Sequence, residues 1–363
     1  MPVFYNPHAV VSRDLTVLFL KSTISRHNFS FVDVLAGTGI RGIRVCLEVG
    51  GQGLLNDIDP RAYYYIKRNI LLNKLEDRAE AYNQEANTLL NTLVFSGVLV
   101  DYVDLDPYGS PIPFIDSAFK PLAKRAYLGV TATDLAPLSC THPHKTLARY
   151  WDKCVRVDFD KEYALRLLIA NIAMRAAALG YALTPRLSVV HRHYIRVFFE
   201  VKRSYSAAYR TLNECLGYIW YCAETLERGY IRDVTETPSC SNGKKPVVLG
   251  KTWICNTSTL ETISRALLEA GKVGFLSLDT VRVLTTLESE VEINTPYIRL
   301  DKLCSALRVN MPKISALINR LRELGFKATR THMEVRGFKT SATFQELRKA
   351  IFELVEKSKK AHT

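Results

Sequence analysis

The sequence predicts an α/β protein with a mostly parallel sheet, helices on both of its faces, and a smaller α+β domain after it. Two observations lead to this prediction. Short apolar runs alternate with amphipathic stretches from about Phe29 to Asp134, which is the pattern of a parallel sheet covered by helices. Two β-rich runs at 182–190 and 194–202 then lie close enough in the chain to form an antiparallel hairpin. The 363 residues suit two domains, which we expect at 1–203 and 204–363.

Each predicted element of the first domain is supported by its local pattern. The strands are short apolar runs stopped by turn residues, at 31–35, 53–57, 79–82, 98–106 and 127–133. The helices are amphipathic stretches, at 41–49, 60–73, 86–95, 113–124 and 160–180. Pro60 suits a first helical turn, Asp160 an N-cap and Gly180 a C-terminal stop. A parallel sheet that ends in an antiparallel hairpin is the arrangement of the class I methyltransferase (Rossmann-like) fold, although a fold alone does not define a function.

The sequence of the second predicted domain indicates a winged-helix-like fold at its C-terminal end. Residues 300–307 and 314–324 indicate helices joined by a turn, Phe326–His332 indicates a strand, and Gly337 marks a wing. Helix, turn, helix and hairpin is the order of a winged helix. Seven Lys/Arg and two Asp/Glu lie between Lys313 and Lys339, which favours nucleic-acid binding, although winged helices also pair proteins.

Composition narrows the class of protein. The net charge of +13 is spread over the chain, with +6 on residues 1–203 and +7 on residues 204–363, which favours a polyanion that touches both domains. No stretch has the order of a signal peptide, and no run of 18 apolar residues indicates a membrane span. The eight cysteines form no C-x-x-C pair, so we expect reduced thiols, no bound metal and a cytoplasmic protein.

A glycine loop follows the first predicted strand. Gly37-Thr-Gly39-Ile-Arg-Gly42 opens a helix, and Asp57 stands 20 residues after Gly37, where a ribose-binding carboxylate is expected. The loop suits NAD and S-adenosylmethionine equally. Asp33 favours S-adenosylmethionine, because a carboxylate is unfavourable near a pyrophosphate and tolerable near an ammonium and a sulfonium. Glu85-Ala86, at the end of the third strand, stands where an adenine is expected.

The fourth strand ends in Asp104-Leu-Asp106-Pro107-Tyr108-Gly109, at the edge of the sheet where ligands bind. The motif resembles the Asp/Asn-Pro-Pro-Tyr/Phe motif of enzymes that methylate amines. An exocyclic amine on a base is a weak nucleophile, and two acceptors for its N–H groups position it and draw off positive charge. We expect Asp106 to be acceptor and proton sink, the Pro107 carbonyl to be second acceptor, and Tyr108 to stack on the base.

With these motifs, the chain resembles the tRNA (guanine-N2) dimethyltransferases that modify position 26, most closely their archaeal members. The resemblance runs almost end to end. The matching segments are Pro2–Pro7 with Ser12–Asp14, Asp104–Pro111, Thr131–Asp134, His193–Val197, and Thr329–His332 with Gly337–Ser341. The chain begins almost inside the first of these motifs, whereas relatives have residues ahead of it.

The resemblance implies an enzyme that transfers one or two methyl groups from S-adenosylmethionine to guanine N2, and a C-terminal domain that binds tRNA. It implies that Arg13 contacts the carboxylate of the cofactor and that Phe4 is a second aromatic facing the target base. It places further cofactor contacts at Arg41, Asp57, Glu85 and Ala86, and the floor of the pocket at Thr131–Asp134. Glu85 replaces the usual aspartate, and Tyr108 a frequent phenylalanine. No protein partner is implied, and we expect a monomer.

Three other functions stay open at this point. A DNA amino-methyltransferase is compatible with the Asp-Pro-Tyr motif but not with the opening and C-terminal motifs. An NAD-dependent dehydrogenase is compatible with the glycine loop and disfavoured by Asp33 and by the motif at Asp106. A non-enzymatic winged-helix nucleic-acid binder is disfavoured by the intact Asp106–Gly109 motif.

Overall fold

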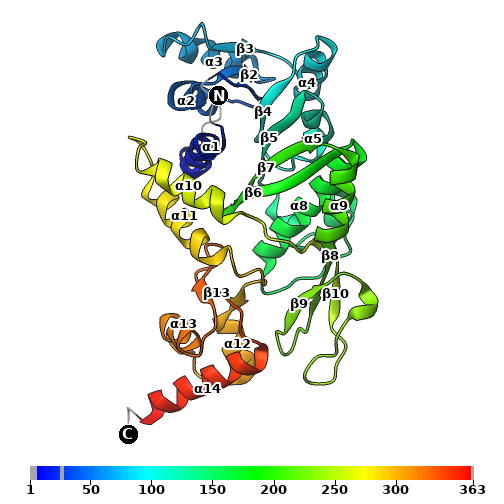
Figure 1. The fold of residues 1–363 in the computed structure, drawn as a ribbon, viewed down its shortest axis with the longest axis vertical. Helices are drawn as coiled ribbons and strands as arrows, with labels where there is room; N and C mark the ends of the chain where they lie inside the picture. Colours follow the sequence, from blue (N-terminus) through cyan, green and yellow to red (C-terminus); the bar gives the residue numbers. More distant parts are fainter. Residues whose placement is uncertain (1–5, 25–27, 361–363) are drawn as a thin grey trace. The chain divides into compact units, whose positions relative to one another are not determined.

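The computed structural model describes residues 6–24 and 28–360 (Figure 1). Phe4, one of the predicted site residues, lies outside them. The chain divides into two compact units, each assembled from three segments. The first unit comprises Met1–Asp134, Ile172–Glu214 and Thr257–Thr285, and the second comprises Leu135–Asn171, Cys215–Asn256 and Thr286–Thr363. The boundary predicted after Arg203 coincides with the end of a strand inside the first unit, and as a domain boundary it stays a prediction.

The first unit is built on a seven-stranded sheet of order β3-β2-β1-β4-β5-β7-β6. The strands are β1 (Ser30–Asp33), β2 (Gln52–Asn56), β3 (Ala79–Tyr82), β4 (Val100–Leu105), β5 (Leu122–Ala132), β6 (Tyr181–His191) and β7 (Tyr194–Arg203). Strands β1 to β5 pair in parallel, and β7 pairs antiparallel with both β5 and β6. This confirms the predicted parallel sheet with a terminal hairpin, which is the class I methyltransferase arrangement.

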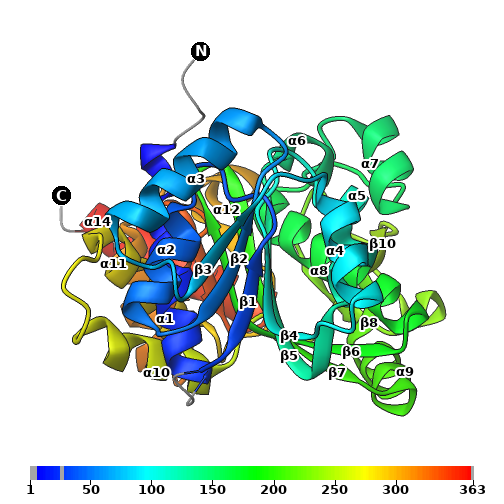
Figure 2. The same cartoon turned by 90° about the horizontal axis from the view of Figure 1, so that it is seen from above.

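Helices cover both faces of this sheet, with α1, α2 and α3 on one side and α4 and α5 on the other (Figure 2). The helices of the first unit, together with the short turn η1 (Pro7–Ala9), are α1 (Val10–Thr23), α2 (Ile40–Glu48), α3 (Pro60–Leu72), α4 (Ala86–Phe95), α5 (Ile112–Phe119), α9 (Tyr205–Cys215) and α10 (Leu260–Ala270). Two of the boundaries between the units fall inside α8 (Asp160–Ala178) and α11 (Leu278–Glu290), and another precedes the last residue of α9.

Two local features explain where helices begin and end. Gly39 precedes α2 with a left-handed φ of 78°, and an added Cβ would lie 3.2 Å from Leu55 and 3.3 Å from Ile66. A glycine therefore allows both the turn and the close packing of α2 on β2 and α3. The helix predicted at 113–124 was too long, because Pro121 has no N–H to continue the helical hydrogen bonds, and β5 begins at Leu122.

The second unit contains two small sheets. The first has the order β10-β8-β9, from β8 (Leu216–Tyr221), β9 (Arg228–Ile231) and β10 (Val247–Trp253). The second has the order β11-β13-β12 and belongs to the winged-helix-like end: β11 (Ile298–Arg299), α12 (Leu300–Leu307), α13 (Ile314–Glu323), β12 (Ala328–Arg330), β13 (Gly337–Thr340) and α14 (Phe344–Lys360). The remaining elements are α6 (Leu135–Leu138), α7 (Pro143–Tyr150) and η2 (Val234–Glu236). The predicted order of helix, turn, helix and hairpin is confirmed.

A buried charge cluster at Glu162 holds the second unit together. The Glu162 carboxylate accepts hydrogen bonds from Arg166 Nη2 at 2.8 Å, from Lys339 Nζ at 2.9 Å, and from the backbone N–H of Tyr297 at 2.9 Å. Burial alone would raise the pKa of Glu162, but the charges of Lys339 and Arg166 outweigh burial and lower it. Lys339, which the sequence counts toward a basic surface, is therefore a core residue that neutralises a carboxylate.

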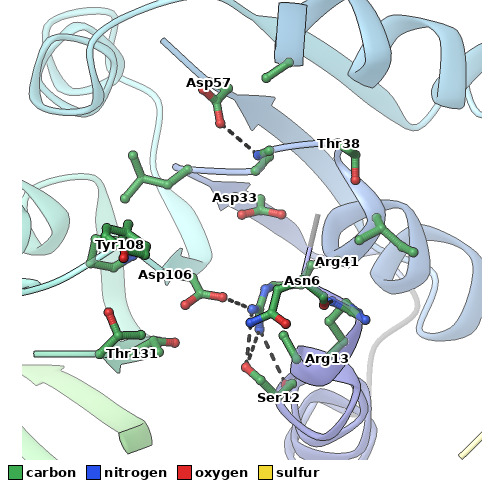
Figure 3. Close-up of a pocket in the computed structure, with 18 of the residues that line it drawn as sticks. Asn6, Ser12, Arg13, Asp33, Thr38, Arg41, Asp57, Asp106, Tyr108 and Thr131 are labelled. Carbon is green, nitrogen blue, oxygen red and sulfur yellow. Dashed lines mark hydrogen bonds and ion pairs between the residues drawn. The ribbon is translucent and has the colours of Figure 1, made fainter. Parts of the chain in front are cut away.

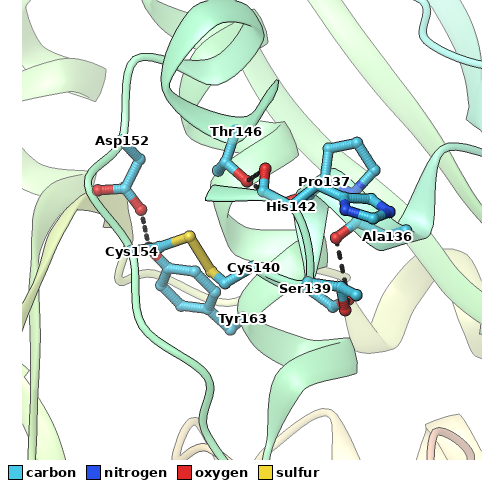
Figure 4. The surroundings of a disulfide bond; sticks show 10 residues. Ala136, Pro137, Ser139, Cys140, His142, Thr146, Asp152, Cys154 and Tyr163 are labelled. Carbon is cyan, nitrogen blue, oxygen red and sulfur yellow. Dashed lines mark hydrogen bonds between the residues drawn. A yellow bond between two sulfur atoms is a disulfide. The ribbon is translucent and has the colours of Figure 1, made fainter. Parts of the chain in front are cut away.

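The expectation of reduced thiols was wrong. Three disulfides join Cys140 to Cys154, Cys215 to Cys255, and Cys222 to Cys240, and Figure 4 shows the first beside the Asp152–Tyr163 hydrogen bond. The partners are 14, 40 and 18 residues apart in sequence, yet their Cα atoms lie 5.8, 5.0 and 5.9 Å apart, within the reach of a disulfide. Spacing along the chain carries no signal of this proximity.

The same disulfides bear on metal binding. Among the described residues, Cys222, Glu227 and Cys240 form the one group whose ligand atoms gather closely enough for a metal ion, within 4.8 Å of one another. Both cysteine sulfurs of this group are joined in a disulfide.

None of the helices in the described part of the chain has the length and apolar character that crossing a bilayer requires.

Asp14 on α1 ties three helices of the first unit together. Its side chain is fully buried and pairs with Arg44 of α2, with 2.6 Å between Oδ1 and Nη1. Its other oxygen accepts from the backbone N–H of Ser277 at 2.9 Å and from the hydroxyl of Thr280 at 2.8 Å, at the start of α11. Asp14 belongs to the opening motif of the sequence, and the structure gives it an architectural role.

We predict that Asp14→Ala destabilises the protein by roughly 3–5 kcal/mol, because it leaves Arg44 and two donors without their buried acceptor. Urea denaturation measures this loss. Glu48→Ala is the matched control, since Glu48 is a second, more exposed partner of Arg44, and a pair of this kind contributes about 0–1 kcal/mol. Equal effects of the two substitutions would contradict the assigned role of Asp14.

Candidate active site

A pocket of about 550 Å³ opens beyond the carboxyl ends of the parallel strands in the first unit. This is where ligands bind in open α/β sheets. The predicted site residues that line it are Arg13, Asp33, Gly37, Arg41, Asp57, Asp106, Pro107 and Tyr108. Gly39, Glu85 and Ala86 are not among its lining residues. These residues come from four separate stretches of the chain that meet around one cavity, and Figure 3 labels Arg13, Asp33, Arg41, Asp57, Asp106 and Tyr108.

Asp33 and Asp57 flank the glycine loop. Asp57 Oδ2 accepts from the backbone N–H of Gly37 at 2.8 Å, which fixes the loop against the end of β2. Asp33 ends β1, is almost fully buried, and accepts from the N–H of Gly42 at 3.2 Å. Burial and then the charge of Asp104 raise the pKa of Asp33 to about 7, against the lowering effect of Arg41. The ionisation of Asp33 therefore changes near neutral pH.

Glu85 and Ala86 lie at the start of α4. Glu85 is the N-cap of this helix, and its carboxylate accepts from the N–H of Thr88 at 2.8 Å and from its hydroxyl at 3.2 Å. Capping satisfies a backbone donor that the first turn leaves without a partner. The local structure thus gives Glu85 a capping role beside the adenine contact that the family resemblance implies.

Asp106 follows β4 and faces Arg41 of α2 (Figure 3). The Arg41 guanidinium pairs with Asp106 through Nη2 and donates from Nη1 to the hydroxyl of Thr16 at 2.8 Å. Its Nε lies 3.6 Å from a carboxylate oxygen of Asp104. Arg41 was expected only as a cofactor contact, and the structure shows that it also holds the predicted proton acceptor in place.

The loop after β4 is tied to the end of β5. The N–H of Gly109 donates to the hydroxyl of Thr133 at 2.7 Å, and the N–H of Thr133 donates to the carbonyl of Gly109 at 2.9 Å. Thr131 and Thr133 line the pocket, in agreement with the expected floor. Tyr108, within this loop, is 93% exposed. Its ring is therefore accessible to a planar partner at the mouth of the pocket.

Next to Asp106, the buried residues Asp104 and Arg196 form an ion pair that was assigned no role from the sequence. Asp104 of β4 is buried and bonds Arg196 of β7, with 3.1 Å between Oδ1 and Nη1. Arg196 also donates to the hydroxyl of Thr131 at 2.9 Å and to that of Tyr102 at 3.1 Å. Burial would raise the pKa of Asp104, but Arg196 and Arg41 outweigh burial and lower it. The sequence signal for Arg196 is an arginine within the apolar first half of β7, Tyr194–Phe199.

Two further residues of the pocket come from the turn before β7 and from its first position. His193 and Tyr194 line it, and both belong to the His193–Val197 segment that the sequence analysis singled out without a role. Because β7 runs antiparallel to β5, its first residues reach the same edge of the sheet as the last residues of β5. The antiparallel strand therefore contributes to the site from its amino end.

Comparison with known proteins agrees with this geometry. A family model described as N2,N2-dimethylguanosine tRNA methyltransferase matches residues 1–352. A tRNA (guanine(26)-N(2))-dimethyltransferase of Methanopyrus kandleri is 35% identical over 97% of this chain and 91% of its own length. A tRNA (guanine(26)-N(2)/guanine(27)-N(2))-dimethyltransferase of Aquifex aeolicus is 34% identical over 98% of this chain and 91% of its own.

A solved structure is similar over nearly the whole chain. Trm1 from Pyrococcus horikoshii, determined in complex with S-adenosyl-L-methionine, superposes with a TM-score of 0.86 at 31% identity. The match covers 96% of this chain and 95% of that protein. Since the family model and full-length relatives above 30% identity both match, the chain belongs to the N2,N2-dimethylguanosine tRNA methyltransferase family.

Proposed function

We propose that this protein methylates the exocyclic N2 amine of guanine 26 in tRNA, with Asp106 and Pro107 as the groups that receive the amine. Family membership makes the chain a tRNA (guanine-N2) methyltransferase that uses S-adenosylmethionine. Position 26 comes from the names of its relatives. The observation that carries the residue roles is the place of Asp106-Pro107-Tyr108 on a cavity at the carboxyl end of β4.

The other side of the same cavity fits S-adenosylmethionine. Asp33 and Asp57 offer carboxylates to an ammonium group and to ribose hydroxyls, and Arg13 offers a guanidinium to a carboxylate. The positive φ of Gly37 at 57° lets the loop backbone turn beside the ligand. When bound, the cofactor supplies an electrophilic methyl group on a sulfonium sulfur. The role of these residues is to bind it and to aim that methyl group toward Asp106.

Asp106 and Pro107 compensate for the weak nucleophilicity of the guanine N2 amine. The Asp106 carboxylate accepts one N–H of the guanine amine, and the Pro107 carbonyl accepts the other, so the nitrogen is held in place. As the N–C bond forms, the nitrogen gains positive charge and releases its proton to Asp106. Arg41 pairs with the same carboxylate and keeps it oriented. Tyr108 stacks on the base, which contributes about 1–3 kcal/mol to its binding.

Family membership also decides among the alternatives. The NAD-dependent dehydrogenase, the DNA amino-methyltransferase and the non-enzymatic winged-helix binder are not members of the matched family. We propose that the C-terminal winged-helix-like end helps to bind tRNA. Because its Lys339 is buried against Glu162, the basic residues that meet RNA are others. The monomeric state and the cytoplasmic location stay predictions.

The function is tested by methyl transfer from labelled S-adenosylmethionine to unmodified tRNA transcripts, with nucleoside analysis of the product. We expect N2-methylguanosine and N2,N2-dimethylguanosine, because the pocket offers two acceptors to the amine. Both products should disappear when guanine 26 is replaced by adenine. Label that persists in that transcript would show that position 26 is not the site, although the enzyme is still a methyltransferase.

The role of Asp106 predicts that Asp106→Asn lowers kcat by roughly 10²- to 10⁴-fold, since the amide cannot take the proton. The affinity for S-adenosylmethionine should change less than threefold. Single-turnover methyl transfer and calorimetry measure the two quantities. Asp116→Asn is the control, because Asp116 is an exposed carboxylate on α5 that pairs with Arg175 at the surface. An Asp106→Asn enzyme with nearly full activity would remove the proton sink from this proposal.

The raised pKa of Asp33 predicts a pH-dependent cofactor affinity. Below about pH 7 Asp33 is protonated and loses its attraction for a cationic ligand, so affinity should fall toward tenfold per pH unit. Calorimetric titration between pH 5.5 and 8.5 measures this slope. The amino group of the cofactor also titrates, so the readout is the difference in pH dependence between the wild-type and Asp33→Asn proteins. Asp33→Asn should bind the cofactor more weakly and should lack the part of the pH dependence that comes from Asp33. Parallel curves for the two proteins would refute the role of Asp33.

A further inference from the structure

Tyr194 has an unpartnered polar group at the active site. It begins β7, lines the pocket and is only 3% exposed. Its hydroxyl is buried and has no hydrogen-bond partner among the described residues. Leaving such a group without a partner costs about 1–3 kcal/mol, and buried polar atoms are nearly always paired. A ligand that completes the hydrogen bond is the physical explanation that also agrees with the place of Tyr194 on the cavity.

The surroundings of the hydroxyl point to the part of the cavity where the base is methylated. Burial raises the pKa of Tyr194, and the charged groups that act on it are, in decreasing order, Arg41, Asp106, Arg196 and Arg13. The strand pairing gives the same location: Ile195 pairs with Ala132 at the end of β5, and the next residue of β5's chain, Thr133, is hydrogen-bonded to Gly109 of the Asp106–Gly109 loop. The ring has edge-on contacts with the rings of His191 and His193, whose centroids are 5.8 and 5.9 Å away. The protonated hydroxyl is therefore a donor held near the acceptor of the amine.

The chemistry of guanine defines what this donor meets. The N2 amine is flanked by N1–H, a donor, and by N3, an acceptor. Asp106 and the Pro107 carbonyl are acceptors and suit the N–H groups, so N3 is left without a donor. Arg41 is already engaged by Asp106, Thr16 and Ser12. Tyr194 is a pocket donor whose hydroxyl has no partner within residues 6–24 and 28–360.

We propose that the Tyr194 hydroxyl donates a hydrogen bond to N3 of the guanine whose N2 amine is methylated. This rests on the proposed role of Asp106, which sets the edge of the base that faces the pocket. Together, Asp106 and Tyr194 read the adjacent donor and acceptor of guanine. Adenine presents N3 at that edge but has no N2 amine.

The test is a double-mutant cycle between protein and RNA. Wild-type and Tyr194→Phe proteins are compared on two tRNAs, one with guanosine and one with 3-deazaguanosine at the methylated position, by single-turnover transfer. We expect Tyr194→Phe to lower the rate on guanosine about tenfold, as for one hydrogen bond. The wild-type protein should lose a similar factor on 3-deazaguanosine, where C–H replaces N3, and Tyr194→Phe should then cost nothing more.

Four controls make the outcome interpretable. Wild-type transfer to guanosine reports on the proposed function itself, separately from the comparison of four rates. Calorimetry should give the same affinity for S-adenosylmethionine in both proteins. Tyr194→Phe should not lower the Tm, because the described part of the chain offers the hydroxyl no hydrogen-bond partner. Tyr205→Phe, an exposed tyrosine on α9, should match wild type. Equal loss from Tyr194→Phe on both RNAs, a loss of cofactor affinity, a clearly lower Tm, or no loss of rate would each overturn the proposal.

Discussion

The site depends on the balance of buried charge between two arginines and three carboxylates. Asp33, Asp104 and Asp106 gather at the carboxyl ends of β1 and β4, where ionised groups removed from water repel one another. Arg41 lies against Asp104 and Asp106, and Arg196 pairs with Asp104 from β7. The two arginines lower the pKa of Asp104, whereas Asp33, which is equally buried and lies near the charge of Asp104, titrates near neutral pH.

In the function proposed for this pocket, the balance of charge serves two ligands of different charge. A cationic sulfonium cofactor favours ionised carboxylates beside it, and an amine that is being methylated needs a carboxylate that takes a proton. In the proposed mechanism Asp33 and Asp106 meet these needs, and Asp104 joins them in offsetting the charge of the Arg41 guanidinium. Arg196 sits below, where it bonds Asp104 and Thr131. It therefore supports both the end of β4 and the pocket floor.

Some motif residues outside the pocket stabilise the fold through buried ion pairs. Asp14, from the opening motif, joins α1 to α2 and to the start of α11. Lys339, from the C-terminal motif, neutralises Glu162 inside the second unit. Both are charges that water no longer solvates, so replacing either leaves a buried partner uncompensated. Short motifs in this chain thus mark buried ion pairs as well as chemistry.

The sequence by itself determined the alternation of strands and helices, the terminal hairpin and the winged-helix order, because these follow from periodicity and turn residues within short windows. It also placed Asp106-Pro107-Tyr108 at a strand end and the glycine loop before α2, since both motifs are contiguous. It did not find α1 or the sheet of β8, β9 and β10, whose patterns are weak.

Only the tertiary structure decided which distant residues meet. The contact of Arg41 with Asp106 joins residues 65 positions apart, and that of Arg196 with Asp104 joins residues 92 positions apart. Similarly, the spacing of the cysteines along the chain does not indicate which of them form disulfides. The capping role of Glu85 and the unpartnered hydroxyl of Tyr194 likewise depend on what surrounds them in space. Local pattern fixes the conformation of a segment, whereas charge balance, burial and hydrogen-bond partners depend on packing between segments that the chain order does not specify.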